Sequence, residues 1–594
     1  MLLVVGWDGA CFELVSRFRR EGRLPVLDGL LERGRAWNVA STIPPVTFPA
    51  WTSFLTGARP DHHGVTDFTI PRTDGYGVRF VNSSHRAMPT LLRAMSEAGL
   101  RVGMYGMPAT YPPEGRGVFE ICGFDTPLGA TASDRAAHPS SLAAELRRRH
   151  GRLGVEGIAQ SRIDDGWHGR ARDRLLDDIA LRTTISLELL ASHPLDVFFV
   201  HFMEPDTASH HFWQFDDEAS PRHRAGPRGV LADVYAALDA SLGQLLAAAG
   251  PDPDLLLLSD HGSAGASDRR IFWNRWLADR GWLAFRATPR EPAALRLKRT
   301  AMALLPPSLQ ARAFSLAGRM ADRVESGARF AGIDWSRTRA YSDEVPYFPS
   351  LRLNLSGREK EGIVAERDRD EVLAALTRDL LAMRDPFDDG PVVLGVRRRE
   401  ELFDGPFSGR YPDLVMELRR PDGYAYAAGS SRAGLEASWC RRLAPGEDSG
   451  AKGTATGGVH GDVGMAVVAG SHAALLEAGE GNSANLGNFG DIGGLDELAV
   501  GALPTCTLPD LGVTALHLAG VEVPARMQGR SLFGAAAAEP AGMGAAPRGE
   551  GVSSGKGEDA DRGDGADTCA GDGDYTEEEE REVAERLRAL GYLP

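Results

Sequence analysis

Short apolar segments that stop abruptly at turn residues constrain this chain more than any other feature of its sequence. Examples are Leu2–Val5, Val197–Val200 and Leu255–Leu258, and stretches with helical periodicity, such as Ala171–Ala191 and Val230–Ala249, lie between them. Strands that are apolar on both faces belong inside a sheet, and helical crossovers join parallel strands. We therefore expect an α/β fold with a largely parallel sheet flanked by helices.

The length of the chain and its changes in composition indicate several parts. A chain of 594 residues exceeds one compact core, so we expect two to four domains or one large domain with insertions. We predict a core formed by residues 1–275 and 450–534, with an inserted subdomain or cap at 276–449. Residues 535–573 are mostly Ala, Gly, Asp, Glu and Ser, a composition typical of a disordered linker.

Several segments after residue 275 have recognisable local patterns. The inserted region begins with a basic helical segment, Ala293–Arg323, and contains an alternating strand-like segment, Leu351–Leu355. A further strand is expected near Gly464–Ala469. The chain ends with a predicted helix at 574–594, which needs a partner for its apolar face. Its signals are a Thr576/Glu579 capping box, an apolar stripe of Val583, Leu587 and Leu590, and a stop at Gly591.

Charge and cysteine usage exclude several classes of protein. A net charge of −16 argues against a general nucleic-acid binder. The five cysteines are scattered without a CxxC pair, which argues against a disulfide framework or a thiolate metal site. We find neither a secretory signal pattern nor an apolar run of membrane length, so we predict a cytoplasmic protein without a membrane partner. The sequence carries no signal for an oligomeric state.

Acidic and histidine residues cluster at the ends of the predicted strands, where α/β proteins bind ligands. The set is Asp8, Asp206, His210, Asp260, His261 and His460. Singly, each is more often a turn, cap or structural residue, so only the combination argues for a site. Mixed carboxylate and imidazole ligands suit zinc, manganese or iron. Three carboxylates and two divalent cations would leave a charge of about +1 to attract a phosphate.

Thr47 is the candidate nucleophile. It follows a proline-rich turn and precedes a predicted helix, in which Pro49 fits the first turn. Free backbone N–H groups at such a position can hold an anionic oxygen, and a metal contact would lower the pKa of the hydroxyl. Taken alone, this segment favours the simpler alternative that Thr47 caps the helix.

The order of these residues resembles that of the alkaline phosphatase superfamily, and most closely its type I phosphodiesterase and nucleotide pyrophosphatase branch. Within that branch the chain is similar to a bacterial and archaeal group of predicted phosphohydrolases and phosphomutases. The resemblance covers most of residues 1–275 and 450–534 and is thin over the middle of the chain. Its motifs are Asp8, Thr47-Phe48-Pro49, Asp206-x-x-x-His210, Asp260-His261-Gly262 and His460-Gly461, together with Thr42–Gly57, Gly106–Pro113, His210–Trp213 and Leu511–Gly534.

The resemblance implies an alkaline phosphatase-like fold and a role for each site residue. One divalent metal would be held by Asp206, His210 and His460, and the other by Asp8, Asp260 and His261, with Thr47 touching the second. Zinc is the expected metal and manganese the alternative. Thr47 would attack a small-molecule phosphate monoester or diester and form a phospho-threonine intermediate that water releases. A phosphomutase-type transfer within the substrate and a catalytically inactive binding module are the two alternatives.

Some residues depart from the pattern of that branch or carry no role in it. Many nucleotide pyrophosphatases have a phosphate-binding asparagine three residues after the nucleophile, and Ala50 takes that place here. The Cys/Ser-x-Pro-x-Arg motif of sulfatases does not fit the residues around Thr47. Trp7 and Trp51 are expected to pack in the core rather than stack on a substrate. His62 and His63 resemble a structural turn, and we assign them no metal role.

Overall fold

The computed structural model describes most of the chain. Three predicted features lie outside the described residues: the basic segment Ala293–Arg323, the linker at 535–573, and the end of the last helix at Leu590 and Gly591. The described residues are 1–71, 76, 78–127, 135–158, 163, 166–286, 330, 332–431, 436–444, 447, 457–471, 503–533 and 575–589.

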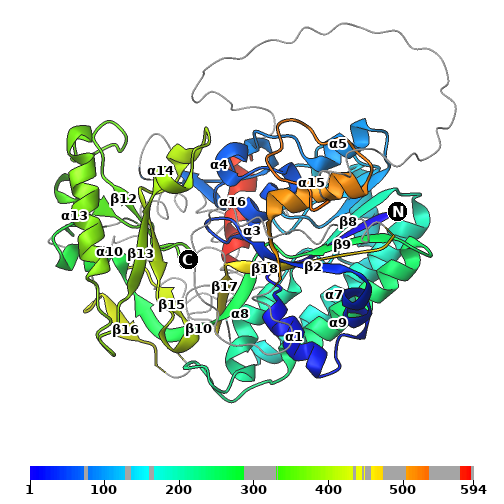
Figure 1. Ribbon diagram of the computed structural model, residues 1–594, viewed down its shortest axis with the longest axis horizontal. Coiled ribbons are helices and arrows are strands. Elements are labelled where there is room, and N and C mark those ends of the chain that lie inside the picture. Colours follow the sequence, from blue (N-terminus) through cyan, green and yellow to red (C-terminus); the bar gives the residue numbers. More distant parts are fainter. Residues whose placement is uncertain are drawn as a thin grey trace, which may run out of the picture.

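A nine-stranded mixed sheet forms the centre of the molecule (Figure 1). Its strands, in spatial order, are β19 (Thr505–Thr507), β2 (Arg35–Ala40), β18 (Val463–Ala469), β9 (Asp254–Leu258), β1 (Leu2–Trp7), β8 (Val197–Phe202), β5 (Val102–Tyr105), β6 (Phe119–Ile121) and β7 (Ala137–His138). The central strands β9, β1, β8, β5 and β6 pair in parallel, whereas β18 and β7 run antiparallel to their neighbours. The predicted α/β class with a largely parallel sheet is confirmed.

The three apolar segments noted in the sequence are the three middle strands of this sheet. Leu3 in β1 lies between Phe198 in β8 and Leu255 in β9, and all three side chains are buried. Burial on both faces explains why these strands are continuously apolar and do not alternate.

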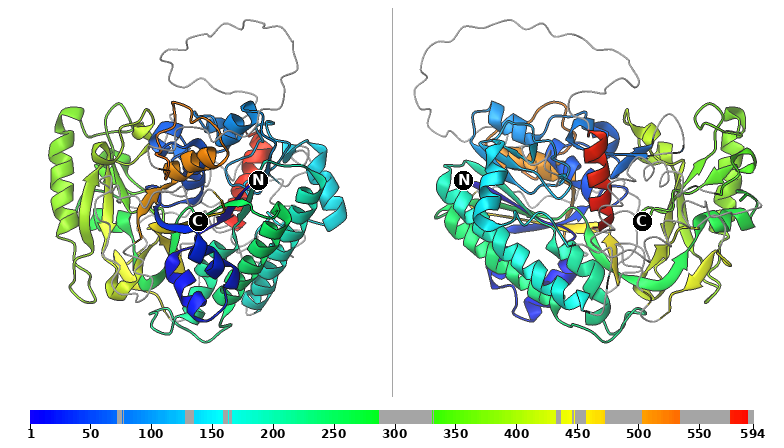
Figure 2. Two further views of the ribbon diagram at one scale, coloured as in Figure 1. Left: turned by 45° about the vertical axis from the view of Figure 1, so that its right-hand side comes forward. Right: turned by 180° about the vertical axis from the view of Figure 1, so that it is seen from behind.

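Helices cover both faces of the sheet (Figures 1 and 2). One face packs on α1 (Phe12–Arg20), α2 (Pro25–Arg33), α6 (Ser141–His150), α7 (Trp167–Ser192), α8 (Glu204–Asp216) and α9 (Val230–Ala249). The other packs on α3 (Thr47–Thr56), α5 (Leu91–Glu97) and α15 (Leu508–Leu518). Two separate buried clusters of apolar side chains fill the spaces between the sheet and these layers.

Helix α9 corrects one sequence-based expectation. It is the one helix among the described residues that is long and apolar enough, by length and composition alone, to cross a membrane. More than half of its most apolar window, 56%, is buried inside the protein, where the helix packs against α7 and α8. The statement that the chain contains no apolar run of membrane length is therefore wrong.

A second region lies beside the main sheet and has its own core. Strands β10 (Gly262–Ile271), β15 (Ala425–Ala428), β16 (Cys440–Arg442) and β17 (Gly458–Gly461) form one small sheet. An antiparallel sheet contains β11 (Ala340–Tyr341), β12 (Ser350–Leu353), β14 (Leu414–Leu418) and β13 (Val393–Arg398), and its helices are α10 (Trp273–Asp279), α13 (Arg369–Leu381) and α14 (Arg399–Leu402). The domain boundaries at 276 and 449 stay a prediction.

The remaining described α-helices and strands are short or come late in the chain. They are α4 (Pro60–His63), the hairpin of β3 (Thr69–Pro71) and β4 (Val78–Phe80), and α16 (Glu577–Ala589). The predicted capping box of α16 is present, since Thr576 N donates to Glu579 Oε2 at 2.8 Å and Glu579 N donates to Thr576 Oγ1 at 3.2 Å. Val583 and Leu587 are buried, as the apolar stripe predicted.

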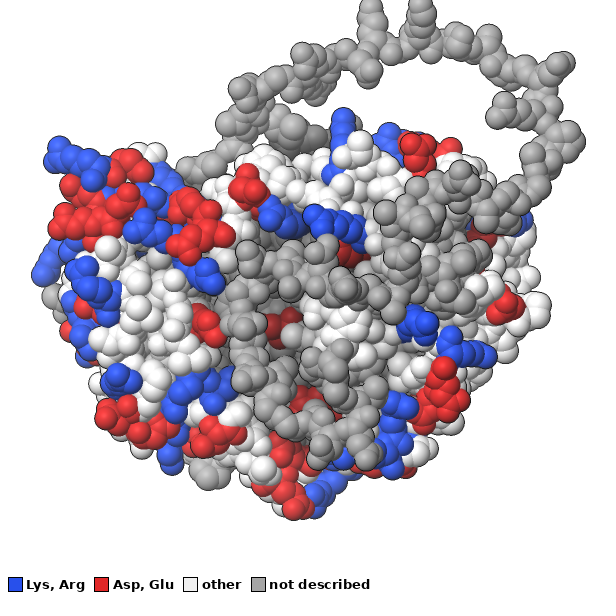
Figure 3. All heavy atoms as spheres, viewed as in Figure 1, with Lys and Arg blue, Asp and Glu red and all other residues white. Residues whose placement is uncertain are grey.

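The described cysteines are unpaired, and the described part of the surface in Figure 3 carries charges of both signs. Cys11, Cys122, Cys440 and Cys506 are free and buried, and Cys569 lies outside the described residues. Acidic and basic side chains alternate in small groups over the described part of the face in Figure 3.

Candidate metal centre and nucleophile

The six predicted metal ligands converge at one edge of the main sheet. Asp8 follows β1, and Asp260 and His261 follow β9. Asp206 and His210 lie in the first turns of α8, directly after β8, so their spacing of four does place them on one helix. His460 lies on β17. Parallel strands end at the same edge of a sheet, and this brings residues that are hundreds of positions apart into contact.

The first ligand group consists of Asp8, Asp260 and His261. His261 Nε2 lies 3.5 Å from Asp8 Oδ1 and 3.4 Å from Asp260 Oδ2. The register of the sheet explains this proximity, because Gly6 pairs with Leu258 and each aspartate follows its strand residue by two positions. All three side chains are completely buried.

The second ligand group consists of Asp206, His210 and His460. Asp206 Oδ1 lies 3.1 Å from His210 Nε2 and 3.4 Å from His460 Nε2. The two groups adjoin each other, because the rings of His261 and His460 stack with their centroids 3.9 Å apart. One ligand atom each from Asp206, His261 and His460 also lies within 4.8 Å of the others.

Each of the three histidines is oriented by a backbone carbonyl. His210 Nδ1 donates to Gly458 O at 2.8 Å, His261 Nδ1 to Gly262 O at 2.9 Å, and His460 Nδ1 to Pro45 O at 2.7 Å. A carbonyl oxygen only accepts, so the proton of a neutral ring sits on Nδ1 and the lone pair on Nε2. That arrangement is typical of histidines that bind a metal through Nε2.

The carboxylates of the first group have their own supporting contacts. Asp8 Oδ2 accepts a hydrogen bond from Trp51 Nε1 at 3.4 Å and lies 3.1 Å from His201 Nε2. Gly9 N donates to Asp260 Oδ1 at 3.1 Å. These contacts turn the other oxygens, Asp8 Oδ1 and Asp260 Oδ2, toward His261.

Sequence reasoning missed His201. It lies in β8, and burial lowers its pKa to about 3, with a smaller contribution from Arg182. The neutral ring then donates from Nε2 to the Asp8 carboxylate. The sequence did carry a signal for this residue, since it is a histidine within an otherwise apolar strand. A polar side chain buried in such a strand needs a hydrogen-bond partner, which here is Asp8.

The electrostatics of the site favour a bound cation. Burial and, next, the neighbouring Asp8 charge raise the pKa of Asp260 well above its ordinary value. Burial and, next, the nearby His261 ring lower the pKa of His460 to about 3. Metal binding requires ionised carboxylates and neutral imidazoles, and a divalent cation would stabilise the Asp8–Asp260 pair in its charged form. The donor set therefore fits divalent metal ions.

Two glycines permit the close packing that the site requires. Gly9 has φ +68°, and a Cβ at this position would lie 3.1 Å from Asp206 Cα. A Cβ on Gly458 would lie 2.2 Å from Ser209 O, so only glycine lets β17 approach α8 this closely.

Thr47 is the first residue of α3, and its side chain is completely buried. Val46 is the N-cap residue, and Thr47 Oγ1 forms no hydrogen bond within the described part of the chain. The alternative that Thr47 caps the helix is therefore wrong. The preceding loop is tied to both ligand groups, because Ser41 Oγ donates to Asp260 O at 2.7 Å and His460 Nδ1 donates to Pro45 O.

Other residues singled out in the sequence pack inside the protein and belong to neither ligand group. Trp7, Ala50 and Trp51 are buried in the core, which confirms core packing for the tryptophans. His63 is buried, with Nε2 3.0 Å from Ser53 Oγ.

His62 belongs to a third group of possible ligands, together with Asp61 and Asp404. Arg59 forms ion pairs with both of those carboxylates and so already supplies a positive charge there.

Tyr347 brings the second region of the molecule to the candidate metal centre. Its ring stacks on His460, with centroids 6.0 Å apart and an interplanar angle of 16°. Its hydroxyl donates to Asp67 Oδ1 at 2.8 Å. Sequence reasoning gave no reason to select this residue, because nothing local links it to the strand ends.

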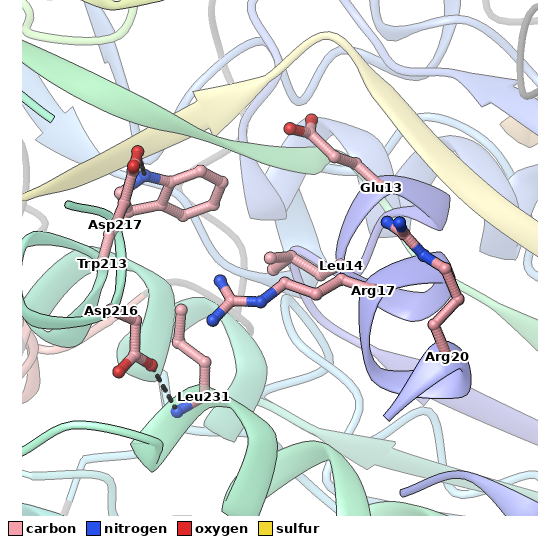
Figure 4. Close-up of a pocket in the computed structure, with 8 residues that line it drawn as sticks. All are labelled: Glu13, Leu14, Arg17, Arg20, Trp213, Asp216, Asp217 and Leu231. Carbon is pink, nitrogen blue, oxygen red and sulfur yellow. Dashed lines mark hydrogen bonds between the residues drawn. The ribbon is translucent and has the colours of Figure 1, made fainter. Parts of the chain in front are cut away.

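A separate pocket of about 210 Å³ lies between α1, α8 and α9 (Figure 4). Its lining residues are Glu13, Leu14, Arg17, Arg20, Trp213, Asp216, Asp217 and Leu231. It contains none of the six candidate ligands. Asp216 accepts hydrogen bonds from the backbone at the start of α9, from Gly229 N at 2.5 Å and Leu231 N at 3.4 Å. This carboxylate therefore has a structural role.

Solved structures of similar shape include phosphonoacetate hydrolase from Sinorhizobium meliloti 1021 in complex with phosphonoformate. It is 15% identical with a TM-score of 0.44, and the alignment covers 78% of this chain and 89% of that chain. Murine ectonucleotide pyrophosphatase/phosphodiesterase 5 is 14% identical with a TM-score of 0.42, covering 88% and 96%. The human protein of that name is 13% identical with a TM-score of 0.43, covering 89% and 96%. No curated protein matches the chain.

The sequence model of type I phosphodiesterases and nucleotide pyrophosphatases matches residues 2–442. This match spans most of the chain and includes five of the six candidate ligands as well as Thr47, while His460 lies beyond its end. The chain therefore belongs to the type I phosphodiesterase/nucleotide pyrophosphatase family, a family of phosphoester hydrolases.

Proposed function

We propose that this protein is a two-metal hydrolase of small-molecule phosphate esters that uses Thr47 as its nucleophile. One observation carries the proposal: a completely buried threonine hydroxyl without a hydrogen bond in the described chain, at the start of a helix whose preceding loop is tied to both ligand groups. Leaving a buried hydroxyl unsatisfied costs about 1–3 kcal/mol, and a bound ion or a catalytic role would account for that cost.

The two ligand groups support a proposal of two metal sites. Asp8, Asp260 and His261 would hold one ion, and Asp206, His210 and His460 the other. Zinc is the first choice and manganese the second, because the ligands are carboxylates and imidazoles. When bound, two divalent cations neutralise phosphate charge and lower the pKa of a hydroxyl beside them.

The chain itself supplies the nucleophile and part of the anion site. Thr47 Oγ gives up its proton and forms a bond to phosphorus as the bond to the ester oxygen breaks. The leaving alkoxide takes up that proton and departs as an alcohol. Water then attacks the phospho-threonine, breaks its Oγ–P bond and releases phosphate or a phosphomonoester. Free backbone N–H groups in the first turn of α3 would stabilise the charge that develops on the phosphoryl oxygens.

Ala50 bears on the substrate class. The asparagine expected there in many nucleotide pyrophosphatases is absent, and Ala50 is buried against the apolar layer between the sheet and α15. A different group must therefore contact the phosphate oxygens. We infer that the substrate preference of the protein does not depend on a nucleotide group. Bis-aryl phosphates and aryl monophosphates are therefore the first substrates to assay.

The direct test combines metal analysis with a substrate panel. Purified protein is depleted with a chelator, then assayed with zinc, manganese or magnesium on bis-aryl phosphates, aryl monophosphates, nucleotides and sugar phosphates. We expect activity to disappear on chelation and to return with zinc or manganese. Full activity of metal-free protein would exclude the mechanism. Phosphoryl transfer to a second substrate hydroxyl, without release of phosphate, would favour the phosphomutase alternative, and metal binding without turnover would favour a binding module.

A further inference from the structure

We infer that the C-terminal helix α16 positions Val46 and Phe48, the apolar side chains on either side of Thr47. We further infer that Glu579 and Arg586 are the two positioning residues that hold the helix in place. The inference rests on the proposed function and extends it to a segment outside the family match. Figure 1 and the right-hand view of Figure 2 show α16, in red, running through the middle of the molecule between the main sheet and the antiparallel sheet.

The apolar face of α16 joins the residues on either side of the nucleophile. Val583 and Leu587 are fully buried in one cluster with Val46 and Phe48, which flank Thr47 in the chain. The same cluster includes Met203, the N-cap residue of the helix that carries Asp206 and His210. Removing α16 would therefore leave a cavity behind both the nucleophile and one ligand group.

Glu579 links the start of α16 to the core with both of its carboxylate oxygens. Oε2 accepts from Thr576 N at 2.8 Å and so caps the helix. Oε1 accepts from Tyr111 Oη at 2.5 Å and from Arg135 Nη1 at 3.0 Å. Tyr575 stacks on the ring of Tyr111, with centroids 5.6 Å apart and an interplanar angle of 10°.

Arg586 fixes the other end of the helix. It is 7% exposed, and its guanidinium donates to Thr126 O at 2.6 Å and to Val155 O at 2.9 Å. Burial lowers the pKa of this guanidinium to about 10. A buried charge is costly, so a helix that only needed to cover an apolar surface would not place an arginine there.

A short path of contacts leads from Arg586 toward Thr47. Arg586 Nη1 donates to Thr126 O, directly after Asp125 in the chain. Burial raises the pKa of the Asp125 carboxyl to about 6, and the Arg586 charge lowers it in part. Asp125 Oδ1 accepts from Ala109 N at 3.2 Å and so supports a non-glycine residue with φ +57°. Ala109 belongs to the cluster that contains Phe48. The helix therefore stabilises a strained loop that packs beside the nucleophile.

Point variants separate positioning from general stability. Arg586→Ala removes both carbonyl contacts, Arg586→Lys keeps the charge, and Glu585→Ala changes an exposed residue of the same helix as the matched control. We expect Arg586→Ala to lower kcat for an aryl phosphate about tenfold or more, with KM within about twofold and both metals retained. Arg586→Lys should recover part of kcat, and Glu585→Ala should match the wild type.

The outcomes distinguish this inference from the proposed function. If the wild type turns over phosphate esters while Arg586→Ala lowers only the melting temperature, with kcat unchanged well below it, the positioning role is overturned. If the wild type shows no phosphoester turnover with any metal, the proposed function fails first.

Adding the helix back in trans gives a second, independent readout. A protease site is inserted within residues 535–573 of the full chain, and the cleaved protein is passed over a sizing column to remove the helix. We expect kcat to fall on separation and to return with a synthetic peptide of residues 575–594, but not with that peptide carrying Arg586→Ala. Unchanged kcat after separation would contradict the inference.

Discussion

The first ligand group comes from two neighbouring strands of one sheet, whereas the second combines a helix with a strand of another sheet. Asp8 and Asp260 follow paired residues of β1 and β9, so strand pairing alone sets them at the same level. His460 reaches Asp206 only because β17 packs on α8 and pairs with β10, where Ser263 lies opposite His460. The register of one sheet therefore defines the first group, whereas packing between a helix and a second sheet defines the second.

Thr47→Ala should have the largest effect of any change near the two groups. It removes the proposed nucleophile but none of the candidate carboxylate or imidazole ligands, so we expect turnover to fall by several orders of magnitude with both metals retained. Thr47→Ser should keep a sizeable fraction, because the hydroxyl remains. Mass spectrometry of acid-quenched enzyme during turnover checks this prediction, and a phosphoryl group found on another residue would contradict it.

Asp260→Asn tests the group that the sheet builds. The amide keeps the shape of the side chain and removes its charge, so the ion held with Asp8 and His261 should bind more weakly. We expect a large loss of turnover that added metal partly reverses, unlike the loss in Thr47→Ala. Metal content measured against free metal concentration checks the assignment, and equal loss of both ions would show that the groups are not independent.

Gly458→Ala tests the group that packing builds. The new Cβ would lie 2.2 Å from Ser209 O, so β17 must move away from α8 and carry His460 from Asp206. Affinity for the second ion should fall by roughly 10–100-fold, comparable to losing a supporting contact, with the first ion little affected. Gly169→Ala is the control, since a Cβ there meets nothing within 4 Å. Isothermal titration with zinc separates the two affinities.

Trp51→Phe removes one hydrogen bond to Asp8 and keeps most of the buried ring. Because His201 still contacts the same oxygen, the first ion should bind only about tenfold more weakly. Trp282→Phe is the control, because it loses a hydrogen bond to Asp379 in the other region of the molecule. An unchanged zinc affinity in Trp51→Phe would show that Asp8 needs no support from this ring.

Replacing residues 535–573 with a Gly/Ser spacer long enough for α16 to reach its place should have the smallest effect. The composition of that segment cannot supply a core, so we expect turnover to stay within about twofold. A folded replacement variant without activity would show that the segment contributes to the site. Aryl phosphate turnover and thermal unfolding measure the two properties separately.

The sequence by itself determined the α/β class, the three central strands, α9, the capping box of α16 and the set of candidate ligands. These features depend on local rules: apolar periodicity, capping chemistry, and the tendency of strand ends to carry functional side chains. The antiparallel direction of β18 was not readable, because an apolar strand has the same pattern in either direction.

Only the tertiary structure decided which groups face each other. It showed that Thr47 does not cap its helix, that Trp51 and His201 orient Asp8, and that Tyr347 stacks on His460. It also packed α16 against Val46 and Phe48, on either side of Thr47, and brought Glu579 of α16 to Tyr111, 468 positions away in the chain. Each of these depends on packing between segments far apart in the chain, and spacing along a sequence encodes neighbours only within a few residues on one helix or strand.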